Sequence, residues 1–107
     1  MHRSHMSAQE RAVRSRLAQL VHAEPVLRAM LNVREVTCGK PGCRCARGEK
    51  HLTLYAVSSQ EGKRRQLFVP RDLEECVRQW VENYHKVRYL LEQVSELSWE
   101  RIKARKP

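Results

Sequence analysis

Long apolar runs are absent from this sequence. No stretch approaches the roughly 20 apolar residues that a helix needs to cross a bilayer, and the N-terminus is charged where a secretory signal would be apolar. Internal repeats and low-complexity tracts are missing as well. We therefore expect a cytoplasmic protein without membrane contact, in which thiols stay reduced.

Familiar catalytic arrangements are also missing. The chain has only four glycines and no Gly-rich phosphate loop. No nucleophile stands beside a base, and no pair of carboxylates is placed for acid–base chemistry. His22 and His85 fall in predicted helical segments and are interpreted as surface residues. The sequence therefore favours a non-enzymatic protein with no small-molecule substrate.

Acidic residues are scarce relative to basic ones. The chain has 21 Lys and Arg against 12 Asp and Glu, which gives a formal net charge of +9. The excess is concentrated between Arg34 and Arg71, where nine basic residues stand against three Glu. A merely solvated surface would also be charged, but this concentration favours a polyanionic partner such as nucleic acid.

The sequence does contain a compact group of thiols. Cys38, Cys43 and Cys45 fall within eight residues, in the run CGKPGCRCARGEKH that ends at His51. Tetrahedral zinc needs ligands wrapped around one point, and the Gly and Pro residues between the first two thiols permit the necessary turns. We predict a structural Zn²⁺ site that uses these three cysteines. The fourth ligand is His51 or, as alternatives, Cys76, water or another group.

Unmetallated thiols, buried as small apolar groups, are the competing interpretation of the loop. The basic side chains of the loop disfavour it, because charged residues resist burial and would offset the negative charge of zinc-bound thiolates. These side chains are Lys40, Arg44, Arg47 and Lys50.

The N-terminal part reads as helical. Ser7 followed by Glu10 fits a capping box, in which both side chains satisfy free amides of the first turn. An apolar seam with steps of three and four residues follows. Glu24 falls where an apolar residue is due and Pro25 comes next, which predicts two helices or one kinked helix. The seam residues are Val13, Leu17, Leu20, Leu27 and Leu31.

Extended segments are predicted in the middle of the chain. Residues 33–38 are sufficiently β-branched for a short strand that leads into the cysteine loop. Residues 51–58 alternate between two faces, and residues 65–69 read as the return strand of a β-hairpin. Glu61 and Gly62 form the turn signal between them.

Three cations, Lys63, Arg64 and Arg65, follow that turn directly. A two-stranded ribbon fits a DNA major groove, and a basic turn can clamp a phosphate backbone. Alternatively, these three cations only protect an edge strand from aggregation and bind no nucleic acid. If the turn and the cysteine loop form one binding face, all their cations should lie on the same side. Tyr55 and Phe68 are interpreted as core residues rather than as platforms for stacked bases.

A long helix is predicted from Asp72 toward Lys106. A hairpin and a short helix cannot cover its apolar stripe, so the N-terminal helix packs along it, a second copy pairs with it as a coiled coil, or both; we favour both. The aromatic residues Trp80, Tyr84 and Trp99 are interpreted as core or dimer contacts. The stripe comprises Leu73, Val77, Trp80, Tyr84, Val87, Leu91 and Val94, widened by Val81, Leu90 and Leu97.

The features that carry a resemblance to a known family are the cysteine run, a tyrosine-containing strand, a Gly-Lys turn and the helix sequence WVENYHKVRYLLEQVSEL. In these features the chain resembles an uncharacterised family of short bacterial and archaeal proteins with a CGKPxCxC…HGxY motif. The resemblance covers about residues 32–98. It implies a zinc site at Cys38, Cys43, Cys45 and His51. Members are often encoded near transposases, which implies a role beside mobile elements, by association only.

Together these observations predict an α+β protein with N-terminal helices, a zinc-stapled loop with a small antiparallel β-hairpin sheet, and a long C-terminal helix that dimerises. Residues 1–5 are interpreted as a cloning remnant, 7–31 as the helical segment, 32–70 as loop and hairpin, and 71–106 as the long helix. The predicted function is binding of nucleic acid, DNA before RNA, as a regulator or mobile-element accessory factor. A protein-interaction adaptor that uses the long helix, or a thiol or metal sensor, is the alternative.

Overall fold

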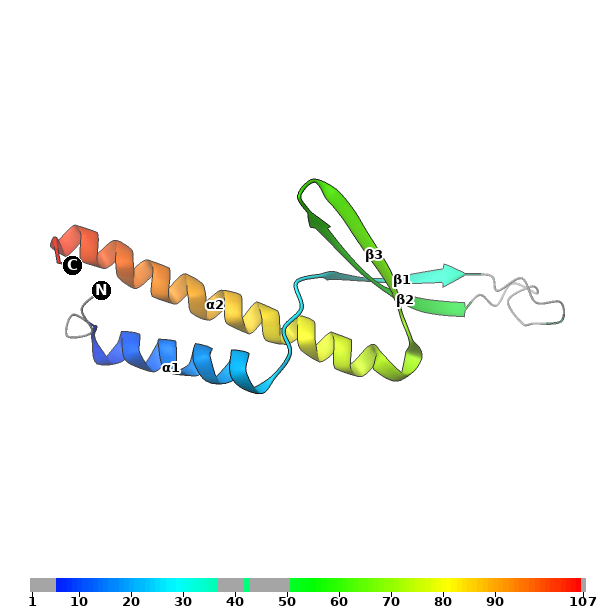
Figure 1. Cartoon of the computed structure of the whole chain (residues 1–107), viewed down its shortest axis with the longest axis horizontal. Helices are drawn as coiled ribbons and strands as arrows, with labels where there is room; N and C mark the ends of the chain where they lie inside the picture. Colours follow the sequence, from blue (N-terminus) through cyan, green and yellow to red (C-terminus); the bar gives the residue numbers. More distant parts are fainter. Residues whose placement is uncertain (1–5, 37–41, 43–50, 107) are drawn as a thin grey trace. The chain divides into compact units, whose positions relative to one another are not determined.

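The computed structural model describes residues 6–36, 42 and 51–106 (Figure 1). Its elements are α1 (Ala8–Ala23), β1 (Met30–Val36), β2 (His51–Gln60), β3 (Lys63–Val69), the 3-10 turn η3 (Arg71–Leu73) and α2 (Glu74–Ala104). The predicted α+β class is therefore confirmed. One compact unit is Arg28–Val81, and the other joins the chain up to Leu27 with the chain from Glu82 onward.

The three strands form one antiparallel sheet in the order β1-β2-β3. The predicted hairpin is present, and both of its strands are longer than expected because pairing continues to Gln60 and Lys63 beside the turn. β1 begins at Met30, three residues before the predicted strand, and pairs with β2 along its whole length. The sequence predicted this strand but not its pairing partner.

The turn between β2 and β3 is a two-residue turn in which both residues have positive φ. Glu61 has φ 53° and Gly62 has φ 77°. This is the turn type whose twist matches that of paired strands. Glycine adopts the conformation without cost, whereas a glutamate pays about 1–2 kcal/mol for it. The hairpin tip is therefore a tightly defined structure.

The core of the unit Arg28–Val81 is small and aliphatic. Leu54 of β2 is 1% exposed and stands directly opposite Val69 of β3, so the two side chains share a face of the sheet. Val77 and Val81, from the first turns of α2, are buried as well. Burying a side chain of this size contributes about 1.5–3 kcal/mol, which makes these few residues the main support of the sheet.

In the other unit, α1 lies alongside the C-terminal part of α2 and runs in the opposite direction (Figure 1). Two polar contacts link the pair at its ends. Glu10 Oε1, in the first turn of α1, lies 2.7 Å from Arg101 Nη2. After α1 ends, the carbonyl oxygen of Pro25 accepts a hydrogen bond of 3.1 Å from Asn83 Nδ2. Glu10 and Asn83 are both 2% exposed.

The predicted capping box forms only in part. Ser7 Oγ accepts a hydrogen bond of 3.1 Å from the backbone N–H of Glu10, as expected for an N-cap. The Glu10 carboxylate instead contacts two arginines, with Oε2 accepting from Arg14 Nε at 2.7 Å. A buried carboxylate between two guanidinium groups is paired, which burial of a charge requires.

The prediction of a second N-terminal helix is wrong. The chain leaves α1 at Glu24, whose φ and ψ are −134° and 147°. Pro25 has no N–H to donate and opposes the helical conformation in the residue before it. Leu27 therefore falls outside any helix, and Leu31 belongs to β1 instead of the helical seam.

The predicted apolar stripe of α2 is buried only in part, since Trp80, Tyr84 and Val94 are half-buried. Val77 and Val87 are buried as predicted, whereas Leu73 is 41% and Leu91 is 51% exposed. Leu90, which was predicted to widen the stripe, is buried. The buried line thus shifts by one residue where α2 packs beside α1.

Neither helix in the described part of the chain combines the length and apolarity that crossing a membrane requires.

Candidate functional site

The sheet brings together the two residues that flank the cysteine-rich segment, which comprises residues 37–50. Val36, the last residue of β1, is paired with His51, the first residue of β2. His51 is exposed at this position. The predicted ligand His51 therefore stands next to the strand that leads toward the cysteines.

The predicted cysteine ligands themselves lie outside the described residues. Within 6–36, 42 and 51–106, no three His, Cys, Asp or Glu side chains gather closely enough to hold a metal ion. Gly42, between the first two predicted ligands, has φ 80°, a conformation that suits glycine and agrees with the turn predicted there. The predicted site residues outside the description are Cys38, Lys40, Cys43, Arg44, Cys45, Arg47 and Lys50.

The alternative fourth ligand, Cys76, is an exposed free thiol in the first turn of α2. A cavity of about 180 Å³ lies between the start of β2, the end of β3 and the start of α2. Its lining includes His51, Arg71 and Glu74 but not Cys76. Sequence reasoning did not connect Arg71 or Glu74 with His51, because only the turn after β3 brings them to the same cavity.

The basic residues that follow the turn do not share one face. Strand pairing sets Lys63 opposite Gln60, Arg64 opposite Ser59 and Arg65 opposite Ser58. Successive residues of a strand point to opposite faces, so Arg64 lies on one side of the hairpin, and Lys63 and Arg65 lie on the other. The expectation that all three cations lie on the same side is therefore wrong, and so is the hypothesis that the turn and the cysteine loop form one binding face.

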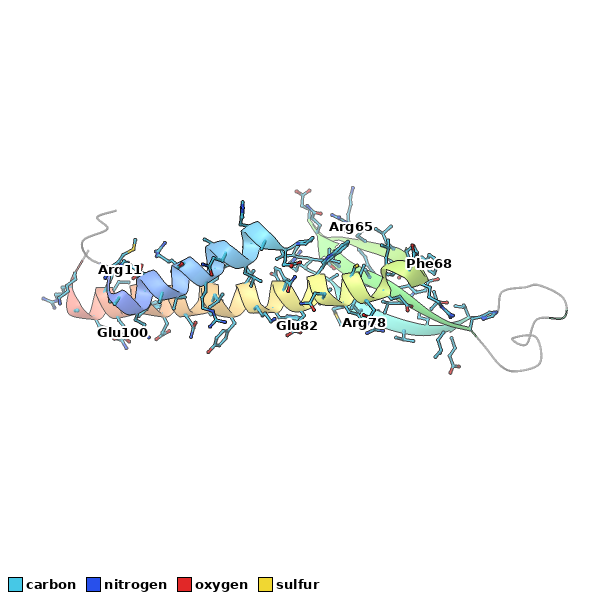
Figure 2. All side chains as sticks on the ribbon, turned by 90° about the horizontal axis from the view of Figure 1, so that it is seen from below. Arg11, Arg65, Phe68, Arg78, Glu82 and Glu100 are labelled. Carbon is cyan, nitrogen blue, oxygen red and sulfur yellow. The ribbon has the colours of Figure 1, made fainter. Side chains whose placement is uncertain are left out.

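All three of these cations are exposed. Arg65 Nη2 donates a hydrogen bond to Gln60 Oε1 across the turn. Within the described residues, none of the three forms an ion pair with a carboxylate. Figure 2 labels Arg65 near the hairpin tip and Phe68 nearer the end of β3. Positive charge at the tip is thus available to an external anion.

The interpretation of Phe68 as a core residue is wrong. Its side chain is 58% exposed, although the neighbouring Val69 is buried. Phe68 pairs with the half-buried Tyr55, and the two rings meet edge to face with centroids 6.1 Å apart. Phe68 and Tyr55 therefore form an aromatic pair at the surface of the sheet.

Comparison with known protein families places most of this chain in one family. A family model described as a domain of unknown function, DUF6788, matches residues 7–79. The chain belongs to this family. No curated protein and no solved structure matches the chain.

The match to DUF6788 covers α1, the whole sheet and the first turns of α2. Both the cysteine-rich segment and the basic hairpin therefore belong to the family domain. Asn83 and Arg101, which link α2 to the N-terminal part of the chain, lie beyond the matched residues.

The helical unit carries a separate cavity. It measures about 530 Å³ and lies between α1 and α2, with Arg16, His85, Lys86 and Tyr89 in its lining. Glu82 lines it too, so the cavity carries charges of both signs. This mixture gives it no clear preference for one ligand class.

Proposed function

We propose that this protein is a non-enzymatic, zinc-containing nucleic-acid-binding protein. The observation that carries the proposal is the hairpin tip, where Lys63, Arg64 and Arg65 are exposed on a fixed turn without carboxylate partners among the described residues. Cations without carboxylate partners exchange counterions for phosphates at little cost. The net charge of +9 adds a favourable long-range field for such a partner.

The distribution of these cations over both sides of the ribbon suits a groove. A nucleic-acid groove is bounded by two phosphate backbones, and a two-stranded ribbon is narrow enough to enter the major groove of DNA. Arg64 would then face one backbone, and Lys63 and Arg65 the other. This arrangement favours DNA over double-stranded RNA, whose major groove is too narrow for side chains to read.

Zinc is the second part of the proposal. Cys38, Cys43, Cys45 and His51 would hold one ion, supported by the pairing of Val36 with His51 and by the positive φ of Gly42. A closed site of four protein ligands has a structural role. It would shape the basic loop that contains Lys40, Arg44, Arg47 and Lys50. A role as a regulator or mobile-element accessory factor is consistent with this design.

One titration series tests the proposal. Fluorescence anisotropy is measured with labelled duplex DNA, single-stranded DNA and RNA at several salt concentrations. Binding should be measurable, and the logarithm of the binding constant should fall linearly with the logarithm of the salt concentration. Absence of binding to every nucleic acid at low salt would reject it.

The adaptor function is a second candidate, favoured by an exposed apolar face on α2. Leu91, Trp99 and Ile102 are each more than half exposed. At 100° per residue they fall within an arc of about 80°, and that arc is separate from the line of Val87, Leu90 and Arg101 that faces α1. Such a face fits a second copy of the helix, so pairing of two chains and nucleic-acid binding can coexist.

A further inference from the structure

One face of the sheet gathers a cationic and aromatic cluster. Tyr55 of β2 stands between Asn32 of β1 and Phe68 of β3 in the strand register. Arg34 follows Asn32 by two residues, and Gln66 precedes Phe68 by two residues. Because side chains two apart on a strand share a face, Arg34, Tyr55, Gln66 and Phe68 all lie on the same side of the sheet. We call these four residues the Arg34 cluster.

Three contacts hold the cluster together. The guanidinium carbon of Arg34 lies over the Tyr55 ring, 4.4 Å from its centre. Arg34 Nη2 also donates a hydrogen bond of 2.8 Å to Gln66 Oε1, two strands away. Tyr55 in turn meets Phe68 edge to face. Arg34 is therefore held in one orientation before any ligand arrives.

Packing alone does not account for this arrangement. Phe68 exposes 58% of its surface on an edge strand, while Arg34 and Tyr55 are only partly covered. The Phe68 ring and the Arg34 guanidinium are therefore two planar groups at the surface of the sheet. The positive charge of Arg34 has no carboxylate counterion among the described residues.

We propose that the Arg34 cluster is a base-stacking platform for single-stranded nucleic acid. This inference rests on the proposed binding of nucleic acid, and it adds a contact for single strands that is separate from the groove contact of the hairpin tip. Unpaired bases stack on aromatic rings and on guanidinium planes, whereas the faces of bases in a duplex are occupied by their neighbours. Phe68 receives one base on its ring, and the outer face of the Arg34 guanidinium receives another.

Charge on the same face supplies the backbone contact. Arg64 precedes Gln66 by two residues and Phe68 by four, so it shares their face of β3. At about 3.4 Å per residue, it lies about 14 Å from Phe68 along the strand. A single-stranded nucleic acid whose bases stack at the Arg34 cluster can therefore place a phosphate against Arg64. Arg64 has no carboxylate partner among the described residues.

The test uses the full chain and labelled oligonucleotides of about 15 nucleotides, a length suited to small single-strand-binding sheets. Affinities for oligo-dT, oligo-rU and a duplex of the same length are measured by anisotropy. Phe68→Leu removes the ring but keeps an apolar side chain. Arg34→Lys keeps the charge but removes the plane. Leu67→Ala is the matched control, because Leu67 is 63% exposed on the opposite face of the same strand.

We expect the wild-type chain to bind oligo-dT or oligo-rU more tightly than the duplex. Phe68→Leu should weaken single-strand binding by about 5- to 150-fold, the range of one lost stacked base, and Leu67→Ala should not. Arg34→Lys should weaken it by at least several-fold while leaving the salt dependence unchanged, because the charge remains. Melting curves for each variant check that the sheet is intact.

Two results would overturn the inference in different ways. Tight binding of duplex alone, or equal effects of Phe68→Leu and Leu67→Ala on oligo-dT, would remove the stacking platform and leave the proposed function standing. Competition by polyglutamate as effective as that by oligo-dT, with no effect of Phe68→Leu, would assign the face to an acidic peptide. Failure to bind any oligonucleotide would remove both proposals.

Discussion

Val36 and His51 stand directly opposite each other across β1 and β2. The chain therefore leaves β1 and enters β2 at neighbouring positions. The connection, residues 37–50, is longer than most between paired strands, and closing it costs conformational entropy. A metal ion held by residues of the connection offsets that cost, which gives the zinc proposal a physical reason beyond the presence of cysteines.

Zinc content is the first prediction. The purified chain should hold about one zinc ion, and Cys43→Ser should release it together with cooperative unfolding of the sheet, because structural zinc and folding are coupled. Metal analysis by mass spectrometry and thermal melts with and without a chelator measure both effects. A chain that lacks zinc when purified under reducing conditions, yet melts cooperatively, contradicts this prediction.

The identity of the fourth ligand is a separate prediction. His51→Ala should weaken zinc binding by at least 10-fold, since His51 is paired with the residue from which the cysteine-rich segment begins. Cys76→Ser should leave zinc affinity unchanged, because Cys76 is an exposed free thiol that does not line the cavity beside His51. Competition against a chromophoric chelator measures the two affinities. The reverse order of effects would assign the ligand to Cys76.

The elements that sequence reasoning recovered are those with a strong local signal. The Ser7 cap, the Glu61-Gly62 turn and the long apolar repeat of α2 each follow from a few neighbouring residues. The prediction of a second N-terminal helix was wrong because the four-residue spacing of Leu27 and Leu31 resembles that of a helical seam. This spacing is accidental, because Leu27 precedes β1 and Leu31 lies within β1, where pairing with β2 decides the conformation.

The candidate site could be predicted only where chemistry is local. Three cysteines close together in the sequence predict a metal site by themselves, and three consecutive cations predict an anion-binding site. The Arg34 cluster has no such signal, because its members are separated in sequence by up to 34 positions and meet only through strand register. The division of Lys63, Arg64 and Arg65 between two faces also follows from register, which the sequence did not define.

The buried ion pair of Glu10 leads to a stability prediction. Glu10→Ala should destabilise the chain by about 3 kcal/mol, because it leaves Arg101, whose side chain is only 15% exposed, without its negative partner. Glu100→Ala is the control. Glu100 pairs with Lys103 at 3.5 Å, but both side chains are more than half exposed, so its loss should cost less than about 1 kcal/mol. Urea titrations followed by circular dichroism compare the two; equal losses would mean that Glu10 has no special role.

Assembly through α2 is the next prediction. The wild-type chain should sediment as a dimer, and the double variant Leu91→Glu and Ile102→Glu should sediment as a monomer, because like charges would face each other across the seam. Both residues are exposed in the single chain, so the variant should keep its helical content. Arg88→Glu with Glu92→Lys, which alters exposed charge without removing apolar surface, is the control. A monomeric wild type excludes this interface.

The last prediction uses the division of the basic tip between two faces. Each phosphate contact that is lost should lower the salt slope of DNA binding by about one unit. Replacing Lys63, Arg64 and Arg65 with Ala should therefore weaken binding and lower the slope by up to about three units, while zinc content and oligomeric state stay unchanged, since all three side chains are exposed at the turn.

Variants of the separate faces then distinguish two modes of contact. If the ribbon enters a groove between two backbones, Arg64→Gln should lower the slope by about one unit, and Lys63→Gln with Arg65→Gln by about two. If a single strand runs along the face of Arg64 and Phe68, only Arg64→Gln should lower the slope, because Lys63 and Arg65 point to the other side. The same titrations with duplex and oligo-dT show which mode each nucleic acid uses. Slopes that no tip variant changes would place the phosphate contacts elsewhere on the chain and remove the hairpin from the interface.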